Sequence, residues 1–361
     1  MSLNAWCELS VRNLRERCPR IRVGLLTDPE GKEPALLDRR GHLPNCTLRH
    51  RGRLSPVPLS REVPTRPRDV SESQRGSYPG SLLAQWARFA SERDFYRFAT
   101  SRLRDAFPTL PDRSQFNRLV RLNLDLIESL ALHLPTLLLG ARGGEEEEEE
   151  EYHCCFEALD CSAIPVRDAK RRGEGWLAGY ADIGWSNRLG WYEGFCLLTA
   201  VDPTGVITGF GFAPASTKDQ PMAETFFALR HQPDPRLPSV GSAASSEPCY
   251  YVVDKGFEGE ERHRRWLDRY GARIICAPKR NSSRKKPWPK RLRRWVAGLR
   301  QIVETVYEKL HNAFGLARER PHELSGLRAR LAAKVALHNF CIWLNEHLGR
   351  PRLAFADLLG W

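Results

Sequence analysis

Apolar and polar positions change their spacing along this chain, and the first regular pattern is helical. Over residues 81–140 the apolar residues recur every three or four positions, which predicts amphipathic helices. One helix is expected over residues 81–107, and another after Asp112, which forms a cap with Gln115 three residues on. We therefore expect a small helical domain at residues 76–142. Its basic faces suit either a DNA-binding module or a helical cap on the next domain.

From Tyr152 onward, β-branched and aromatic residues gather in short runs that predict strands. The first run is expected to form a strand that ends near Asp160, with Pro165 closing the segment. Residues 177–217 predict a strand, a turn, a strand, an Asp-Pro-x-Gly turn and a strand. Pro221 then opens a helix, strands and helices alternate, and two long helices end the chain. This order predicts an α/β fold with a mixed sheet and helices on its faces.

A buried strand with a carboxylate at its end stands near the middle of this second pattern. Residues 250–257 read Tyr-Tyr-Val-Val-Asp-Lys-Gly-Phe, where the apolar run predicts a core strand and Gly256 a turn. Asp254 is therefore expected at the carboxyl end of that strand. A carboxylate in such a place is costly unless it is paired or binds a cation.

A third carboxylate lies on the helix predicted at residues 293–314. Glu304 follows Arg300 by four residues, so the two side chains share one helix face. That face borders an apolar stripe expected to pack on the sheet, which consists of Trp295, Leu299, Ile302, Val303, Val306 and Leu310. Glu304 is therefore expected to point from the edge of the packed side toward the sheet.

Two aspartates and a glutamate at one sheet edge have a clear chemical use. Asp160, Asp254 and Glu304 together could hold two divalent cations about 3.5–4 Å apart, as in two-metal phosphodiester chemistry. Oxygen ligands select Mg²⁺, with Mn²⁺ as an alternative. Taken singly, each residue has a simpler interpretation. Asp160 could be a turn residue, Asp254 could cap the following loop, and Glu304 could pair with Arg300 at the surface.

The charge balance of the chain indicates which class of partner it binds. The 361 residues are 41% hydrophobic and carry a formal net charge of +12, which favours nucleic acid or an anionic membrane surface. A basic protein without such a partner is the plain alternative. Residues 279–294 hold nine basic residues and no acidic one, which suits phosphate contacts, with Trp288 available for base stacking. The candidate DNA contacts are Lys255, Lys279, Arg280, Arg284, Lys285, Lys286, Trp288, Lys290, Arg291, Arg293, Arg294, Arg300 and His311.

The remaining segments predict little chemistry. Residues 1–75 read as a flexible basic arm, and the seven glutamates within residues 143–151 read as an acidic linker. No apolar run reaches about 18 residues, so no membrane span is expected, and we find no export signal. A cytoplasmic location and reduced thiols follow as expectations. Cys154, Cys155 and Cys161 cluster, but neighbours in a strand point to opposite faces and chelate poorly.

Three motifs carry a resemblance to a known family. The segments Leu-Asp-Cys-Ser-Ala-Ile-Pro-Val at Asp160, Tyr-Tyr-Val-Val-Asp-Lys-Gly-Phe at Asp254 and Arg-Gln-Ile-Val-Glu-Thr-Val-Tyr at Glu304 resemble those of DDE-type insertion-sequence transposases. The resemblance extends over residues 81–361. It implies a ribonuclease H-like core in which the three carboxylates bind two Mg²⁺ ions. It also implies cleavage of double-stranded DNA at transposon ends and transfer of a 3′ hydroxyl into target DNA.

The helix signature of that family is matched in part. Relatives carry Tyr-x-x-Arg-x-x-x-Glu-x-x-x-x-x-x-Lys, and Arg300 and Glu304 fit it. Ala297 stands in place of the tyrosine and His311 in place of the lysine, and a histidine supplies a lysine-like charge only when protonated.

The resemblance also sets the remaining expectations. Residues 152–361 should form the catalytic domain, with a homodimer on DNA and a nucleoid-associated bacterial location. A metal-dependent nuclease of the same fold and a catalytically retired DNA-binding relative remain alternatives.

Overall fold

The computed structural model describes residues 80–86, 89, 91–105, 107–108, 110–140, 156–168, 177–232, 239–241, 250–279 and 288–358. The predicted basic arm and acidic linker lie outside these ranges. The proposed division into an arm, a helical domain, a linker and a catalytic domain therefore stays a prediction.

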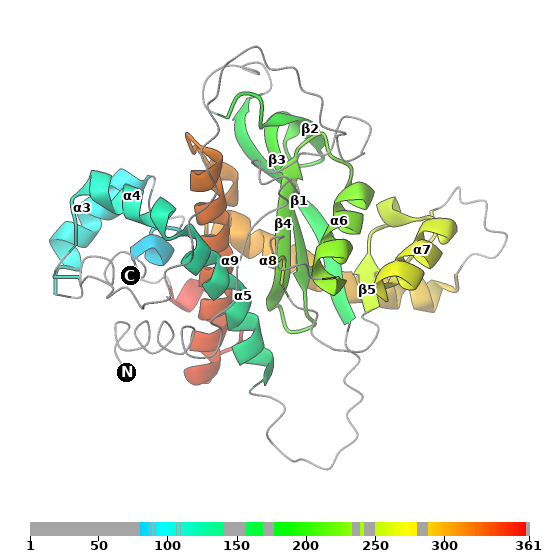
Figure 1. Ribbon diagram of the computed structural model, residues 1–361. Coiled ribbons are helices and arrows are strands. Elements are labelled where there is room, and N and C mark those ends of the chain that lie inside the picture. The colour runs from blue at the N-terminus through cyan, green and yellow to red at the C-terminus, as the bar shows by residue number, and fades with distance from the viewer. Residues whose placement is uncertain are drawn as a thin grey trace.

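A six-stranded mixed sheet forms the centre of the molecule (Figure 1). Its path runs β2-β3-β1-β5-β6, and β4 pairs with the same β3 strand. The pairs β1–β3, β2–β3 and β3–β4 are antiparallel, whereas β1–β5 and β5–β6 are parallel. The strands are β1 (Phe156–Asp168), β2 (Asp182–Ser186), β3 (Gly190–Val201), β4 (Ile207–Pro214), β5 (Tyr250–Val253) and β6 (Arg273–Cys276).

Helices cover both faces of the sheet, because its central strands are apolar on both sides. On one face α6 (Asp219–His231) and α7 (Glu260–Tyr270) pack in a cluster with Leu159 and Leu198. On the other, α8 (Lys290–Asn312) and α9 (Leu324–His347) pack in a larger cluster. The expected α/β class, a mixed sheet flanked by helices as in ribonuclease H-like folds, is confirmed.

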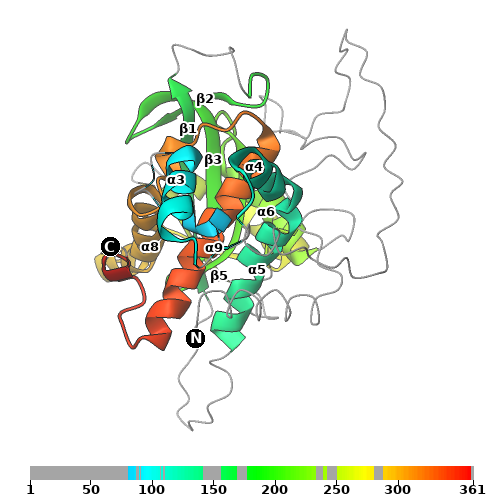
Figure 2. The ribbon, with the colours of Figure 1, turned by 90° about the vertical axis from the view of Figure 1, so that its left-hand side faces the viewer.

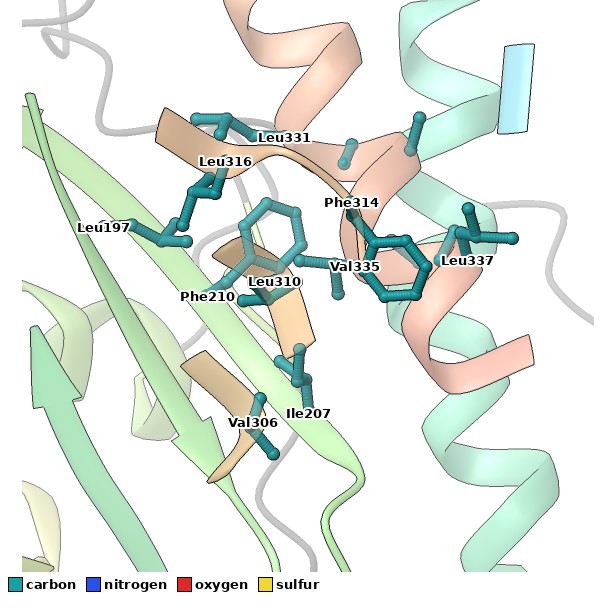
Figure 3. Packing of buried hydrophobic residues seen from close by; sticks show 14 of the residues in the cluster. Leu197, Ile207, Phe210, Val306, Leu310, Phe314, Leu316, Leu331, Val335 and Leu337 are labelled. Carbon is teal, nitrogen blue, oxygen red and sulfur yellow. The ribbon is translucent and has the colours of Figure 1, made fainter. Parts of the chain in front are cut away.

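The larger cluster fixes α8 against the sheet. Figure 3 shows Val306 and Leu310 of α8 beside Ile207 and Phe210 of β4, with Val335 of α9 between Leu310 and Phe314. These α8 residues are fully buried, at 0% exposure. Each fully buried side chain of this size contributes roughly 1.5–3 kcal/mol. This packing therefore holds α8, including the polar residues that it carries, firmly against the sheet.

The N-terminal helices are shorter than the sequence pattern predicts. The structure has α3 (Glu92–Arg102), α4 (Arg113–Leu122) and α5 (Leu124–Gly140). Ser91 caps α3, and Asp112 caps α4 as predicted, accepting from the main-chain N–H groups of Ser114 and Gln115. The second predicted helix is bent by 61° between α4 and α5, because α5 lies along α9 (Figure 2).

The described helices also bear on membrane insertion. None of them alone is long and apolar enough to cross a bilayer, and α4 with α5 passes that test only as a bent pair.

Strand β1 differs from the prediction. It runs from Phe156 to Asp168, so Asp160 lies inside the strand rather than at its end. Pro165 does not close it but lies where the register to β3 shifts, and such a bulge tolerates a residue without an N–H. Opposite it, a Cβ on Gly194 would lie only 2.0 Å from the oxygen of Ile164, so the close approach of the two strands requires glycine.

Candidate active site

Two parallel strands bring the two aspartates together. Leu159 of β1 pairs with Val253 of β5, so Asp160 and Asp254 follow at the next position of the same register. Asp254 comes directly after β5, as predicted, and begins the short 3₁₀ turn Lys255–Phe257. The fold therefore delivers two carboxylates side by side from segments 94 residues apart.

Arg300 of α8 connects these carboxylates. Its Nη2 lies 3.1 Å from Oδ2 of Asp160, and its Nη1 lies 3.2 Å from Oδ1 of Asp254. Glu304, one turn further along α8, has Oε1 4.0 Å from the same Nη2. The side chain of Arg300 is only 18% exposed. One guanidinium therefore bridges the two aspartates and reaches the glutamate, and it gathers all three predicted acids around a single positive charge.

Tyr307 fixes the helix against the strand that carries Asp160. Its buried hydroxyl lies 2.7 Å from the main-chain oxygen of Asp160 and 2.9 Å from that of Leu197. Tyr307 lies on α8 with Arg300 and Glu304. Its contact therefore helps to fix the positions of Arg300 and Glu304 relative to β1 and β3.

Burial and neighbouring charges act in opposite directions on the pKa of Asp160. Burial raises the pKa of Asp160 to about 6, while Arg300 and the N–H of Cys161, 2.8 Å from Oδ1, act in the opposite direction. The nearby carboxylates of Asp219 and Asp254 raise the pKa further. An added cation would favour the ionised form of Asp160, so this carboxyl is suited to bind one.

A fourth carboxylate near the site was not predicted to be part of it. Residues 215–224 resemble the segment that follows the third strand in DDE-type transposases, and that resemblance gives Asp219 a local structural or DNA-facing role. In the structure it is the first residue of α6, and burial, followed by the charge of Asp254, raises its pKa. The adjacent Gln220 donates a 2.6 Å hydrogen bond to the oxygen of Gly256 in the turn after Asp254. Nothing local in the sequence signals this approach, which arises from packing of α6 on the sheet.

Comparison with known proteins gives one match. The model of the transposase DDE domain matches residues 158–340, about half of the chain, and that span contains Asp160, Asp254 and Glu304. The chain belongs to the transposase DDE domain family. No curated protein and no solved structure matches it. Transposases act on DNA, and the DDE family generally uses divalent metal ions.

The donor set of this transposase domain fits such ions. Three carboxylates from β1, the end of β5 and α8 meet at one place, and hard oxygen donors suit Mg²⁺ or Mn²⁺. The guanidinium of Arg300 lies between two of them, at Asp160 and Asp254. Asp254 and Glu304 are about half exposed, at 49% and 51%, which leaves room for ions and a phosphate.

His311 differs from the lysine that the family signature carries at its position. Its Nε2 lies 2.8 Å from Oγ of Ser162 on β1. Burial, and secondarily the charge of Arg188, lowers its pKa to about 4. The imidazole is therefore neutral near pH 7 and does not supply the lysine charge in this state. A contact of His311 with DNA stays a prediction.

The predicted basic contacts divide into three groups. Arg280, Arg284, Lys285 and Lys286 lie outside the described residues. Arg300 is bound to the aspartates. The predicted contacts that the structure describes as exposed cations form a third group, which we call the basic surface: Lys255, Lys279, Lys290, Arg291, Arg293 and Arg294.

The predicted stacking residue also differs. Trp288 packs partly buried against the small cluster of Phe156, Val252 and Val296, whereas Trp295 is 51% exposed. The apolar stripe predicted on α8 is therefore shifted by one residue at its start, from Trp295 to Val296. Trp295 is the more accessible aromatic for a base.

Proposed function

We propose that this protein is a DNA transposase that cleaves at transposon ends and transfers the cut strand into target DNA. The observation that carries the proposal is the Arg300 guanidinium bound to Asp160 and Asp254, with Glu304 one turn away. Three acids grouped around one cation are costly without function. Membership of the transposase DDE domain family supports the same interpretation.

In this proposal the carboxylates of Asp160, Asp254 and Glu304 hold two Mg²⁺ ions, for which Mn²⁺ can substitute. When bound, such ions supply charge stabilisation and a more acidic attacking water or hydroxyl. The protein contributes position. Tyr307 fixes α8 against β1, and Arg300 turns from the aspartates toward a phosphate when ions replace its charge. No covalent enzyme intermediate is required.

The basic surface binds the DNA in this account. Lys290, Arg291, Arg293 and Arg294 are exposed on the same helix as Arg300, with no acidic residue in the first turn. Cations at a helix N-terminus oppose the helix dipole, so their presence there argues for an anionic partner. Phosphate contacts fix the position of DNA without reading its sequence. Two ends must be held together, so we propose a homodimer on double-stranded DNA.

The test is end-specific cleavage. The full-length protein is incubated with Mg²⁺ and DNA that carries the inverted repeats flanking its gene. We expect nicks at the repeat ends and joined products with a target plasmid. Asp254→Asn should bind the same DNA but not cut it, and unchanged cutting would overturn the metal-ligand assignment. Cutting without joining favours a nuclease, and binding without cutting by the unsubstituted protein favours a retired relative.

A further inference from the structure

One cysteine of β1 and one of β3 face each other on the α6 side of the sheet. Cys161 of β1 pairs with Leu198 of β3, and Ala163 pairs with Cys196, so the two thiols are diagonal neighbours. Both pack with the cluster on the α6 face of the sheet. Asp160 and Cys161 are consecutive in a strand, so the carboxylate of Asp160 points to the opposite face. The partner of Cys161 is therefore a residue 35 positions away rather than its sequence neighbours.

Asp219 completes this group from the first turn of α6. The Sγ atoms of Cys161 and Cys196 and a carboxylate oxygen of Asp219 all lie within 4.8 Å of one another. Ligands of a tetrahedral zinc ion are spaced roughly 3.5–3.8 Å apart, given bonds of about 2.3 Å to sulfur and 2.0–2.2 Å to oxygen. Small side-chain rotations would therefore close the group around an ion.

We propose that Cys161, Cys196 and Asp219 form a binding site for one thiophilic divalent cation of the zinc class. Two sulfur donors and one oxygen donor prefer Zn²⁺ or Cd²⁺ over Mg²⁺. Cys161 and Asp219 are partly exposed and Cys196 is buried, so the group reaches solvent at Cys161 and Asp219. Binding releases the two thiol protons to solvent, and water fills the fourth position.

The site is separate from the oxygen-lined one but adjoins it. The N–H of Cys161 donates to Oδ1 of Asp160. The charge of Asp219 raises the pKa of Asp160, and the charge of Asp254 raises that of Asp219. An ion held by the thiols therefore lies one residue from a proposed catalytic ligand. Its binding does not depend on the proposed transposase activity, so the two proposals can fail independently.

The experiment is a Cd²⁺ titration of the reduced, metal-free, full-length protein in excess Mg²⁺, followed by the ultraviolet absorption of cadmium thiolates. We expect a component that Cys161→Ser and Cys196→Ser each lose. Cys341→Ser, which alters a buried thiol on α9, should retain it, as should Asp254→Asn. Asp219→Asn should keep the thiolate absorption but bind Cd²⁺ more weakly. A Cys161→Ser titration that superimposes on that of the unsubstituted protein would overturn the proposal.

A second measurement needs no variant and covers the case in which a serine substitution unfolds the chain. Alkylation of Cys161 in the unsubstituted protein is followed by peptide mass spectrometry with and without Zn²⁺. We expect Zn²⁺ to protect Cys161 and a chelator to restore its reactivity, with no protection by Mg²⁺. Equal alkylation rates with and without Zn²⁺ would refute the site.

Discussion

Tyr307 of α8 donates a 2.7 Å hydrogen bond to the main-chain oxygen of Asp160. The bond joins the helix that carries Arg300 and Glu304 to the strand that carries the first aspartate. A second contact of the same hydroxyl, 2.9 Å from the oxygen of Leu197, extends the connection to β3. This hydroxyl therefore adds a polar contact to the apolar packing that holds α8 against β1 and β3.

Removing that hydroxyl should affect both stability and cleavage. Tyr307→Phe leaves buried carbonyl oxygens without this donor, so we expect the free energy of unfolding to fall by about 1–3 kcal/mol. DNA cleavage should slow while DNA affinity is retained, because the basic surface is unchanged. Tyr96→Phe is the matched control, since the Tyr96 hydroxyl also donates to a main-chain oxygen, that of Pro111, away from the site. Equal cleavage by Tyr307→Phe and the unsubstituted protein would show that the hydrogen bond is only structural.

Arg300 should compete with the metal for the aspartates. In Arg300→Gln, loss of a nearby positive charge should raise Mg²⁺ affinity by roughly tenfold at mildly alkaline pH, where Asp160 is ionised. Cleavage should fall, because the same charge is no longer available to a phosphate. Calorimetric titration with Mg²⁺ measures the first effect, and Arg293→Gln on the same helix should leave it unchanged. Weaker Mg²⁺ binding by Arg300→Gln would mean that the guanidinium organises the ligands instead.

The cations in the first turn of α8 should lower the stability of the fold and strengthen DNA binding. Replacing Lys290 and Arg291 with glutamine removes charges that oppose the helix dipole. The free energy of unfolding, measured by thermal unfolding, should therefore rise by about 0.3–1 kcal/mol for each substitution. The same variant should bind DNA more weakly, and the slope of log affinity against log salt should fall by about one for each phosphate that these side chains neutralise. Arg350→Gln, an exposed cation outside the basic surface, should leave DNA binding unchanged. A stability loss without weaker binding would count against the DNA-binding role.

Glu128 should make the packing of α5 on α9 sensitive to pH. It lies 3.1 Å from Arg328 and is 2% exposed, and burial raises its pKa to about 7 despite that partner. The folded state therefore holds this proton more tightly than the unfolded state. Stability from this group is fully present below its unfolded value of 4.5 and is lost as the pH rises toward about 7. Across this window, the melting temperature should fall with rising pH less steeply in Glu128→Gln than in the unsubstituted protein. Identical slopes for the two proteins would contradict the assignment.

Local patterns predicted the architecture well where a single element decides it. The strand before Asp254 and the Asp112 cap both follow from neighbouring residues. The extent of β1 did not, because Pro165 is tolerated only through the register shift opposite Gly194. The bend between α4 and α5 likewise depends on docking against α9.

The sequence singled out the three acids as candidate ligands, but it did not predict their contacts. The spacing of Arg300 and Glu304 put them on one face, yet only the fold brings Arg300 to Asp160 and Asp254 together. The approach of Asp219 to the site was not predicted, since it depends on how α6 packs. Trp288 was expected to be free for stacking, and the apolar cluster that holds it is formed by residues distant in sequence.

The central claim is that Asp160, Asp254 and Glu304 together hold divalent cations. Mn²⁺ binding, measured by electron paramagnetic resonance on the full-length protein, tests it most directly. We predict two bound ions per chain, and weaker or lost binding in each of Asp160→Asn, Asp254→Asn and Glu304→Gln, with Glu308→Gln on the same helix as the unaffected control. Unchanged Mn²⁺ binding in all three variants would contradict the account.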